Sequence, residues 1–462
     1  MVDLIGFLKS IWDVLNAGGP AVFMPIIMFI FALAFRMSIR RAFEAALRLG
    51  IAYTGIFLIL EFMLKAIGEA SRVMVERTGA QFVALDAGWP VMAAIAFATP
   101  VGMLVIIVGL LVNLLLIVLR LTKTIDVDIW DYWHAAFAGA IALILTGDMP
   151  LALLVAAFTQ VYAIKHADWT KKMLWEVWPG YKGYTIVVDW LVSSWIGIWA
   201  KAIIERVVPK INKVRADVEG IKLKLGLAGE PAVLGLIIGA AIGIAAGYNV
   251  IEVLILAIQS ATVFILLPIV AGMLMEGLVP IAEGVRDFMM KRYAGREIYI
   301  GMDSAITIGH PAVILLTTLT APIYIIAALT LPGNQILPYA DIIAPYWWAG
   351  VIALTAGNIL FSVLIAIPII IVFLLIANLI WPAYTNIALS VGAIEAGQKV
   401  GFIWVEPAFI VGFIAGKLTS IQIAYIFVII LIIITALSDR IKGLANAFSR
   451  LAYSSASSRE EN

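Results

Sequence analysis

Runs of about 20 mostly apolar residues recur along the whole chain, and this is the length that a membrane-spanning helix needs. Apolar residues make up 63% of the 462 residues and charged residues only 13%, whereas a soluble domain carries about 25% charged residues. The sequence therefore predicts an all-α polytopic membrane protein that is located in the plasma membrane, which is the inner membrane in a cell with two membranes. The clearest runs lie at 20–36, 44–66, 90–119, 148–165, 184–204, 231–247, 250–272, 308–331, 360–381 and 420–437.

Composition also excludes several classes of partner and site. The net charge of +1 gives no reason to expect a nucleic-acid partner. The absence of cysteine rules out disulfides, thiolate metal sites and a cysteine nucleophile on this chain. The three histidines, His134, His166 and His310, are scattered, so we expect neither a metal nor a cofactor.

Two further apolar stretches, 130–147 and 342–358, are short and carry Asp, His, Asn or Gly. Interrupted segments of this kind are typical of re-entrant or broken helices, which carriers use to line a solute site. We therefore expect two broken-helix hairpins. Asp148 and Asn358 fall at their tips, where polar groups are available to a solute.

An internal duplication is visible at an offset of 211–217 residues. Four short segments match in the same order. Each match alone is weak, because apolar segments draw on few residue types and often match by chance. The pairs are AGGPAV (17–22) with AGEPAV (228–233), FVALDA (82–87) with YIGMDS (299–304), DYWH (131–134) with PYWW (345–348), and AGAIAL (138–143) with AGVIAL (349–354).

Basic residues predict that the two copies have opposite orientations, since cytoplasmic loops collect Lys and Arg. Arg40 and Arg41 follow the first helix of copy one, and the matching loop of copy two has no basic residue. After the second helix the bias is reversed. Inverted copies need an odd number of crossings, which we take as five each, and a final helix brings the total to about eleven, with the amino terminus outside and the tail inside.

This reading divides the chain into six parts. They are an interfacial amphipathic helix (1–17), a first repeat (18–200), a basic cytoplasmic linker (201–228), a second repeat (229–416), a final helix (417–438) and a cytoplasmic tail (439–462).

Ionisable groups within membrane segments are costly and are candidates for function. Asp86 and Asp303 match each other across the duplication, and each precedes a helix start, where a carboxylate can also be a simple N-cap. Asp303 would share a helical face with His310, seven residues later, if the segment is helical. His134 follows an acidic aromatic stretch whose rings are either interface anchors or a sugar-stacking surface. His166 fits a solvated loop.

Several segments together resemble one family. The sequence is similar to the galactitol-type enzyme IIC of the bacterial phosphotransferase system, and more distantly to the ascorbate-type enzyme IIC. The similarity covers about residues 18–440. The segments are GPAVFMPII, DAGWP, VDIWDYWHAAFAGA, GEPAVLGLIIG, EGLVPIA, GMDSAITIGHPAV, PGNQILP and AGNILF.

The resemblance implies a homodimeric permease that imports galactitol or a similar polyol or sugar by alternating access. It implies phosphorylation by a phosphocysteine on a separate soluble enzyme IIB, itself supplied by enzyme IIA. Asp303 matches the substrate carboxylate and would be catalytic, and His134 matches the histidine of the IWxxWH segment. Ser304 departs from the proline expected there. The full substrate-binding set that we expect is Asp86, His134, Asp303, His310, Asp148 and Asn358.

One alternative reading stays open from the residues alone. The chain could be a cation-coupled secondary carrier of the same fold that moves an unphosphorylated solute, with Asp86, Asp303 and His310 as a proton relay. In the phosphotransferase reading, the basic linker 201–228 and the loop 284–297 would guide the soluble partner electrostatically.

Overall fold

The computed structural model describes residues 20–34, 37–126, 128–214, 227, 230–292 and 298–441. The predicted interfacial helix (1–17), residues 215–226 and 228 of the linker 201–228, and nearly all of the tail 439–462 lie outside these residues. The helices are α2 (Pro20–Ala34), α3 (Ile39–Met63), α4 (Glu69–Thr78), α5 (Trp89–Ala98), α6 (Pro100–Val118), α7 (Tyr132–Thr146), α8 (Met149–Val177), α9 (Ile196–Val207), α11 (Pro231–Ala246), α12 (Val250–Arg292), α13 (Pro311–Thr330), α14 (Tyr346–Leu354), α15 (Ile359–Ser390), α16 (Pro407–Lys417) and α17 (Ile421–Ala436).

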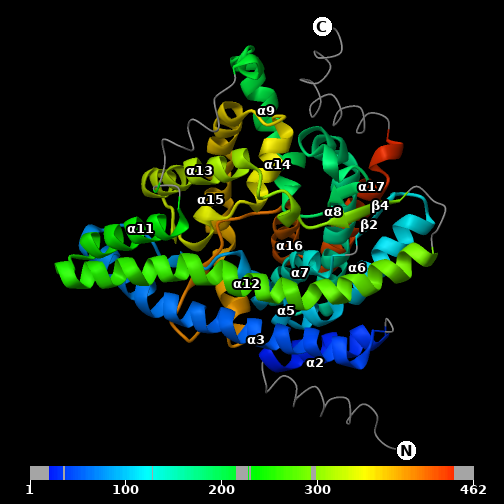
Figure 1. Cartoon of the computed structure of the whole chain (residues 1–462), viewed down its shortest axis with the longest axis horizontal. Coiled ribbons are helices and arrows are strands. Elements are labelled where there is room, and N and C mark those ends of the chain that lie inside the picture. The colour runs from blue at the N-terminus through cyan, green and yellow to red at the C-terminus, as the bar shows by residue number, and fades with distance from the viewer. Residues whose placement is uncertain are drawn as a thin grey trace, which may run out of the picture.

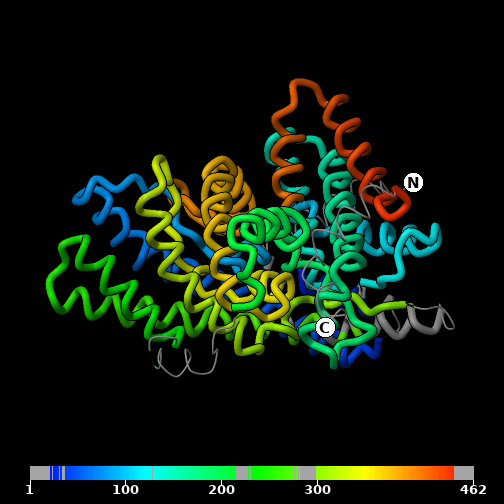
Figure 2. The backbone as a smooth tube through the Cα atoms, turned by 90° about the horizontal axis from the view of Figure 1, so that it is seen from above, coloured from blue at the N-terminus to red at the C-terminus, as the bar shows by residue number. Residues whose placement is uncertain are grey.

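The helices form two layers (Figure 1). In the first layer, which we call the platform, the long α12 packs against α3 and α11, α2 packs on α3, and α4 packs on α11. The second layer, which we call the core, contains α5 to α9 and α13 to α17. Figure 2 shows α16 and α17, orange to red, standing beside α8, and α17 contacts α8 directly.

Seven of the described helices are long and apolar enough to cross a membrane, and four shorter apolar helices accompany them. Many of their large apolar side chains point outward, as membrane-facing residues must. Examples on α3 and α12 are Ile39, Phe43, Leu47, Leu58, Ile251, Leu254 and Ile258. The prediction of a polytopic helical membrane protein is therefore confirmed at this level.

Two predicted spans are broken. The run 90–119 divides at Thr99, whose hydroxyl accepts the Gly102 amide at 3.0 Å and caps α6, with Pro100 at its first position. The run 184–204 is not one helix. It forms a strand, a short 3₁₀ helix η4 (Trp190–Ser194) and the 12-residue α9.

Six short strands form two three-stranded parallel sheets, which the all-α prediction missed. They are β1 (Ala84–Asp86), β2 (Thr124–Asp126), β3 (Tyr184–Ile186), β4 (Tyr299–Met302), β5 (Ile336–Leu337) and β6 (Val400–Gly401). In sheet A, β1 lies between β5 and β6, with Leu85 opposite both Leu337 and Val400. In sheet B, β4 lies between β2 and β3, with Gly301 opposite Asp126 and Thr185.

The sheets interlock the two halves of the chain. Sheet A takes its central strand from the first half and both edge strands from the second, and sheet B does the reverse. At four to two residues each, these strands are too short to show a periodic apolar pattern, which explains why sequence patterning missed them.

The suspected hairpins have matching corners. Gly147 (φ 70°) and Gly357 (φ 79°) adopt the left-handed conformation that favours glycine. The next residue caps the following helix: Asp148 accepts the Leu151 amide at 2.7 Å, and Asn358 accepts the Phe361 amide at 3.2 Å. The short helices α7 and α14 precede these corners.

Candidate functional site

The carboxyl ends of the sheet B strands collect acidic side chains. Asp126 ends β2, Asp189 follows β3 and Asp303 follows β4, and parallel strands end at the same edge of a sheet. Asp303 is 3% exposed; its carboxylate accepts the Ala305 amide at 2.5 Å and interacts electrostatically with the Asp189 carboxyl. Asp303 is thus also the N-cap of the short 3₁₀ helix η7 (Ser304–Ile306).

His134 joins this acidic edge to the second half of the chain. Its Nδ1 lies 2.5 Å from Glu406 Oε1, and its Nε2 lies 3.4 Å from Asp189 Oδ1. The Nε2 contact is electrostatic and does not meet hydrogen-bond geometry. Glu406 Oε1 also accepts the Trp404 indole N–H at 3.0 Å, and Ser304 Oγ donates to Asp189 Oδ2 at 2.8 Å.

The backbone at Asp189 is strained. Its φ is +62°, a region that residues with a side chain rarely adopt. Such strain persists only where the surroundings fix the conformation and is frequent at functional sites. The Ser304 hydroxyl and the His134 ring hold the Asp189 carboxylate from two sides.

Around these residues the protein leaves buried polar atoms without partners of its own. Both carboxylate oxygens of Asp131, Glu406 Oε2 and His134 Nε2 receive no hydrogen bond from the described residues. The buried indole N–H groups of Trp190 and Trp347 likewise make no hydrogen bond with the described residues. Trp347 stacks on Trp404 at 4.3 Å, so one of these donors lies beside the residue that binds Glu406.

Three of these residues, His134, Asp189 and Glu406, could in principle supply metal ligands. The two ring nitrogens of His134 lie on opposite sides of the imidazole, however, and each faces a different carboxylate. The donor atoms of the three side chains lie within 4.8 Å of one another, and His134 stands between the two carboxylates in a chain of contacts.

The equivalent end of sheet A is built differently. Asp86 is completely buried, and its carboxylate accepts backbone amides from Tyr339 (3.1 Å), Asp341 (2.9 Å) and Ile403 (3.4 Å). These amides follow β5 and β6, so Asp86 ties all three strands together. Asp86 is not the cap of α5, whose N-cap is Gly88.

The other predicted site residues are placed apart from this cluster by their contacts. Asp148 accepts the Tyr425 hydroxyl at 2.6 Å. Asn358 donates to the Ile211 and Val214 carbonyls at 3.1 and 3.0 Å, which fixes the start of the linker. His310 caps α13 and packs edge-on to Trp178 at 5.2 Å.

Two expectations about histidines are wrong. The segment from Asp303 to His310 is a 3₁₀ turn followed by a new helix, so the shared helical face does not form. His166 is fully buried within α8, with both ring nitrogens lacking a hydrogen bond, and does not lie in a solvated loop.

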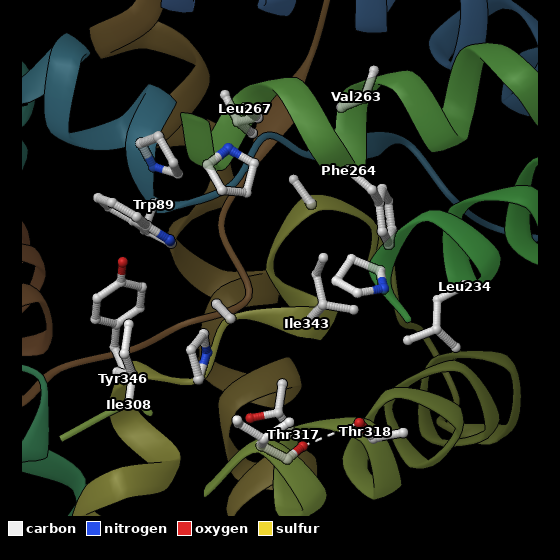
Figure 3. A pocket seen from close by; sticks show the side chains of 17 residues that line it. Trp89, Leu234, Val263, Phe264, Leu267, Ile308, Thr317, Thr318, Ile343 and Tyr346 are labelled. Atoms are coloured by element: carbon white, nitrogen blue, oxygen red, sulfur yellow. Dashed lines mark hydrogen bonds between the residues drawn. The ribbon is translucent and has the colours of Figure 1, made fainter. Parts of the chain in front are cut away.

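A cavity of about 310 Å³ lies next to the two sheet ends (Figure 3). Its walls are mostly apolar and include Leu234, Phe264 and Ile343. Trp89 and Tyr346 stand against each other at one side, with ring centroids 4.9 Å apart. Tyr346 also interacts electrostatically with Asp303, Asp189 and Asp341, so this wall of the cavity is close to acidic groups of both sheet ends.

Sequence reasoning missed Asp189 and Glu406. Asp189 has an unusual backbone conformation, and no sequence motif predicts it. Glu406 precedes Pro407 at a helix start, just as Glu230 precedes Pro231, so its sequence context indicates only a helix boundary. The acidic stretch around Asp131 was noticed, but its role was assigned to the aromatic residues.

Buried polar groups at the ends of broken helices, inside a polytopic helical membrane protein, define a solute carrier. The chain belongs to the EIIC-GAT family, the phosphotransferase-system (PTS) sugar-specific permease components, whose family model matches residues 13–397.

Individual relatives agree with this membership. A protein of Escherichia coli (strain K12) named as a permease IIC component is 33% identical over 412 residues, covering 89% of this chain and 94% of its own. The PTS galactitol-specific EIIC component of the same strain is 32% identical over 386 residues, covering 83% and 85%. The galactitol-specific component of E. coli O157:H7 matches to the same extent.

Proposed function

We propose that this permease binds a polyol of the galactitol type at the acidic edge of sheet B and carries it inward for phosphorylation by a soluble enzyme IIB. The observation that carries the proposal is the set of buried acceptors and donors without protein partners around Asp131, His134 and Glu406. Leaving such groups unpaired costs about 1–3 kcal/mol each. A polyol supplies hydroxyls that both donate and accept.

The substrate is placed at the cluster and not in the neighbouring cavity. Hydroxyl recognition needs polar groups at fixed positions, and the cavity walls are mostly apolar. Asp303, Asp131 and His134 would bind hydroxyls, while Asp86, Asp148 and Asn358 would hold the architecture. The aromatic residues Trp190 and Trp347 would stack on the carbon chain and donate through their indoles.

The inverted duplication is part of the proposal. It is supported by the reciprocal strand exchange between sheets A and B and by the matched corners at Asp148 and Asn358. Because each sheet joins both halves, moving one half against the other would break strand pairs. We therefore place the moving boundary for alternating access between the platform and the core. The proposal also includes about eleven membrane crossings and a homodimer.

Transport by vesicles tests the function directly. Proteoliposomes are given labelled galactitol with and without phosphorylated enzyme IIB, and the internal label is separated into free and phosphorylated solute. We expect label inside as galactitol phosphate, and only with the phosphorylated partner. Concentrative uptake of unmodified galactitol, driven by a cation gradient without the partner, would instead establish the cation-coupled alternative.

A further inference from the structure

We propose that His134 is the proton acceptor for the substrate hydroxyl and that Glu406 is its positioning residue. This inference rests on the proposed function and assigns a chemical step within the same site. The family resemblance implies that Asp303 is catalytic, and the geometry favours a different atom, His134 Nε2, as the proton acceptor.

The first step of the argument is the hydrogen bond at Nδ1. Glu406 Oε1 lies 2.5 Å from His134 Nδ1, and a carboxylate can only accept, so the ring proton resides on Nδ1. A carboxylate in this position fixes the tautomer and orientation of the ring and stabilises the imidazolium that forms later. The Trp404 indole in turn holds Glu406 Oε1 at 3.0 Å.

The second step concerns the opposite nitrogen. Because Nδ1 carries the proton that Glu406 accepts, the lone pair of Nε2 is the basic position that remains, and it receives no hydrogen bond from the part of the chain that the structure describes. The His134 side chain is 1% exposed, so Nε2 opens toward the acidic edge and not toward bulk solvent. Asp189 Oδ1, 3.4 Å away, is placed to stabilise an imidazolium on this side.

Asp303 is less suited to take the proton. Its carboxylate already accepts the Ala305 amide as the cap of η7, and it interacts electrostatically with the Asp189 carboxyl. Asp303 is thereby left to accept a hydrogen bond from the hydroxyl and orient it.

The reaction balances as follows. The substrate hydroxyl oxygen attacks the phosphorus of a cysteinyl phosphate on the soluble partner. The new O–P bond forms, the S–P bond breaks, and the cysteine leaves as a thiolate on that partner. The hydroxyl proton passes to His134 Nε2, which gives an imidazolium between Glu406 and Asp189.

Other titratable groups surround this dyad and share its electrostatic environment. Glu406 interacts electrostatically with tyrosines of two packed helices, and Asp189 with acids of the sheet edge. These groups are Tyr162 on α8, Tyr384 on α15, Asp128, Asp131 and Asp303.

The test is the pH dependence of galactitol phosphorylation in proteoliposomes with phosphorylated enzyme IIB. Glu406→Gln keeps a hydrogen-bond acceptor for Nδ1 and removes the charge. We expect the maximal rate to fall about tenfold or more and the acidic limb of the pH–rate profile to move to lower pH. Galactitol affinity, measured by calorimetry, should fall by much less than the maximal rate. His134→Gln should abolish the acidic limb together with most of the rate.

One control keeps the result interpretable. Glu395→Gln removes an exposed carboxylate from a loop and should match the wild type throughout. A Glu406→Gln profile identical to the wild type would overturn the dyad, as would an acidic limb that is kept in His134→Gln. If the variants still phosphorylate galactitol in either case, the dyad is wrong and the proposed permease function still holds.

Discussion

Asp86 and Asp303 occupy equivalent places at the ends of the two sheets, yet their surroundings are opposite in character. Asp86 accepts three backbone amides, which satisfy its carboxylate completely within the protein. Asp303 accepts one amide and faces a cluster of other acids. The protein therefore satisfies one aspartate with its own backbone amides and leaves the other among acids, so equal position at a sheet end does not indicate equal surroundings.

The largest expected effect comes from Asp303→Asn. This change should abolish galactitol phosphorylation and weaken galactitol binding, because the hydroxyl loses its anionic acceptor. Calorimetry and product analysis on the purified variant measure both effects. Wild-type affinity and turnover would show that Asp303 is only the cap of η7 and would move the site elsewhere.

Asp86→Asn should give the converse result. An amide presents an N–H group toward at least one of the three backbone donors, so we expect a loss of about 1–3 kcal/mol in the free energy of unfolding. Affinity for galactitol should be retained by the folded fraction. Thermal unfolding in detergent, followed with and without galactitol, separates the two quantities. A stable variant that no longer binds galactitol would place Asp86 in the site.

The helix caps at the two matched corners, Asp148 and Asn358, can be compared in the same way, with a smaller expected effect on stability. Asp148→Ala and Asn358→Ala each remove a helix cap, which costs about 1 kcal/mol. Asn358 also holds two carbonyls at the start of the linker, so its replacement should destabilise the protein more than that of Asp148. Equal shifts in the unfolding temperature would mean that the linker contacts contribute little.

The sequence was sufficient to predict a polytopic helical membrane protein and two residues of the candidate site. Apolar runs and sparse charge identify a polytopic helical protein because membrane insertion demands them, and His134 and Asp303 stand out because polar groups there are costly. Glu406 lies 272 residues from its partner His134, so the contact is created by the tertiary fold alone. The positive φ of Asp189 and the two-residue strands β5 and β6 likewise have no local sequence pattern.

The strand exchange between the sheets also has a consequence for biogenesis. During synthesis β1 emerges long before residues 336–401, which supply both of its neighbours. The first half of the chain therefore enters the membrane with the edges of β1 unpaired, and such distant pairings are slow to form. Sheet A, and with it the contact between His134 and Glu406, can be completed only after nearly the entire chain has left the ribosome.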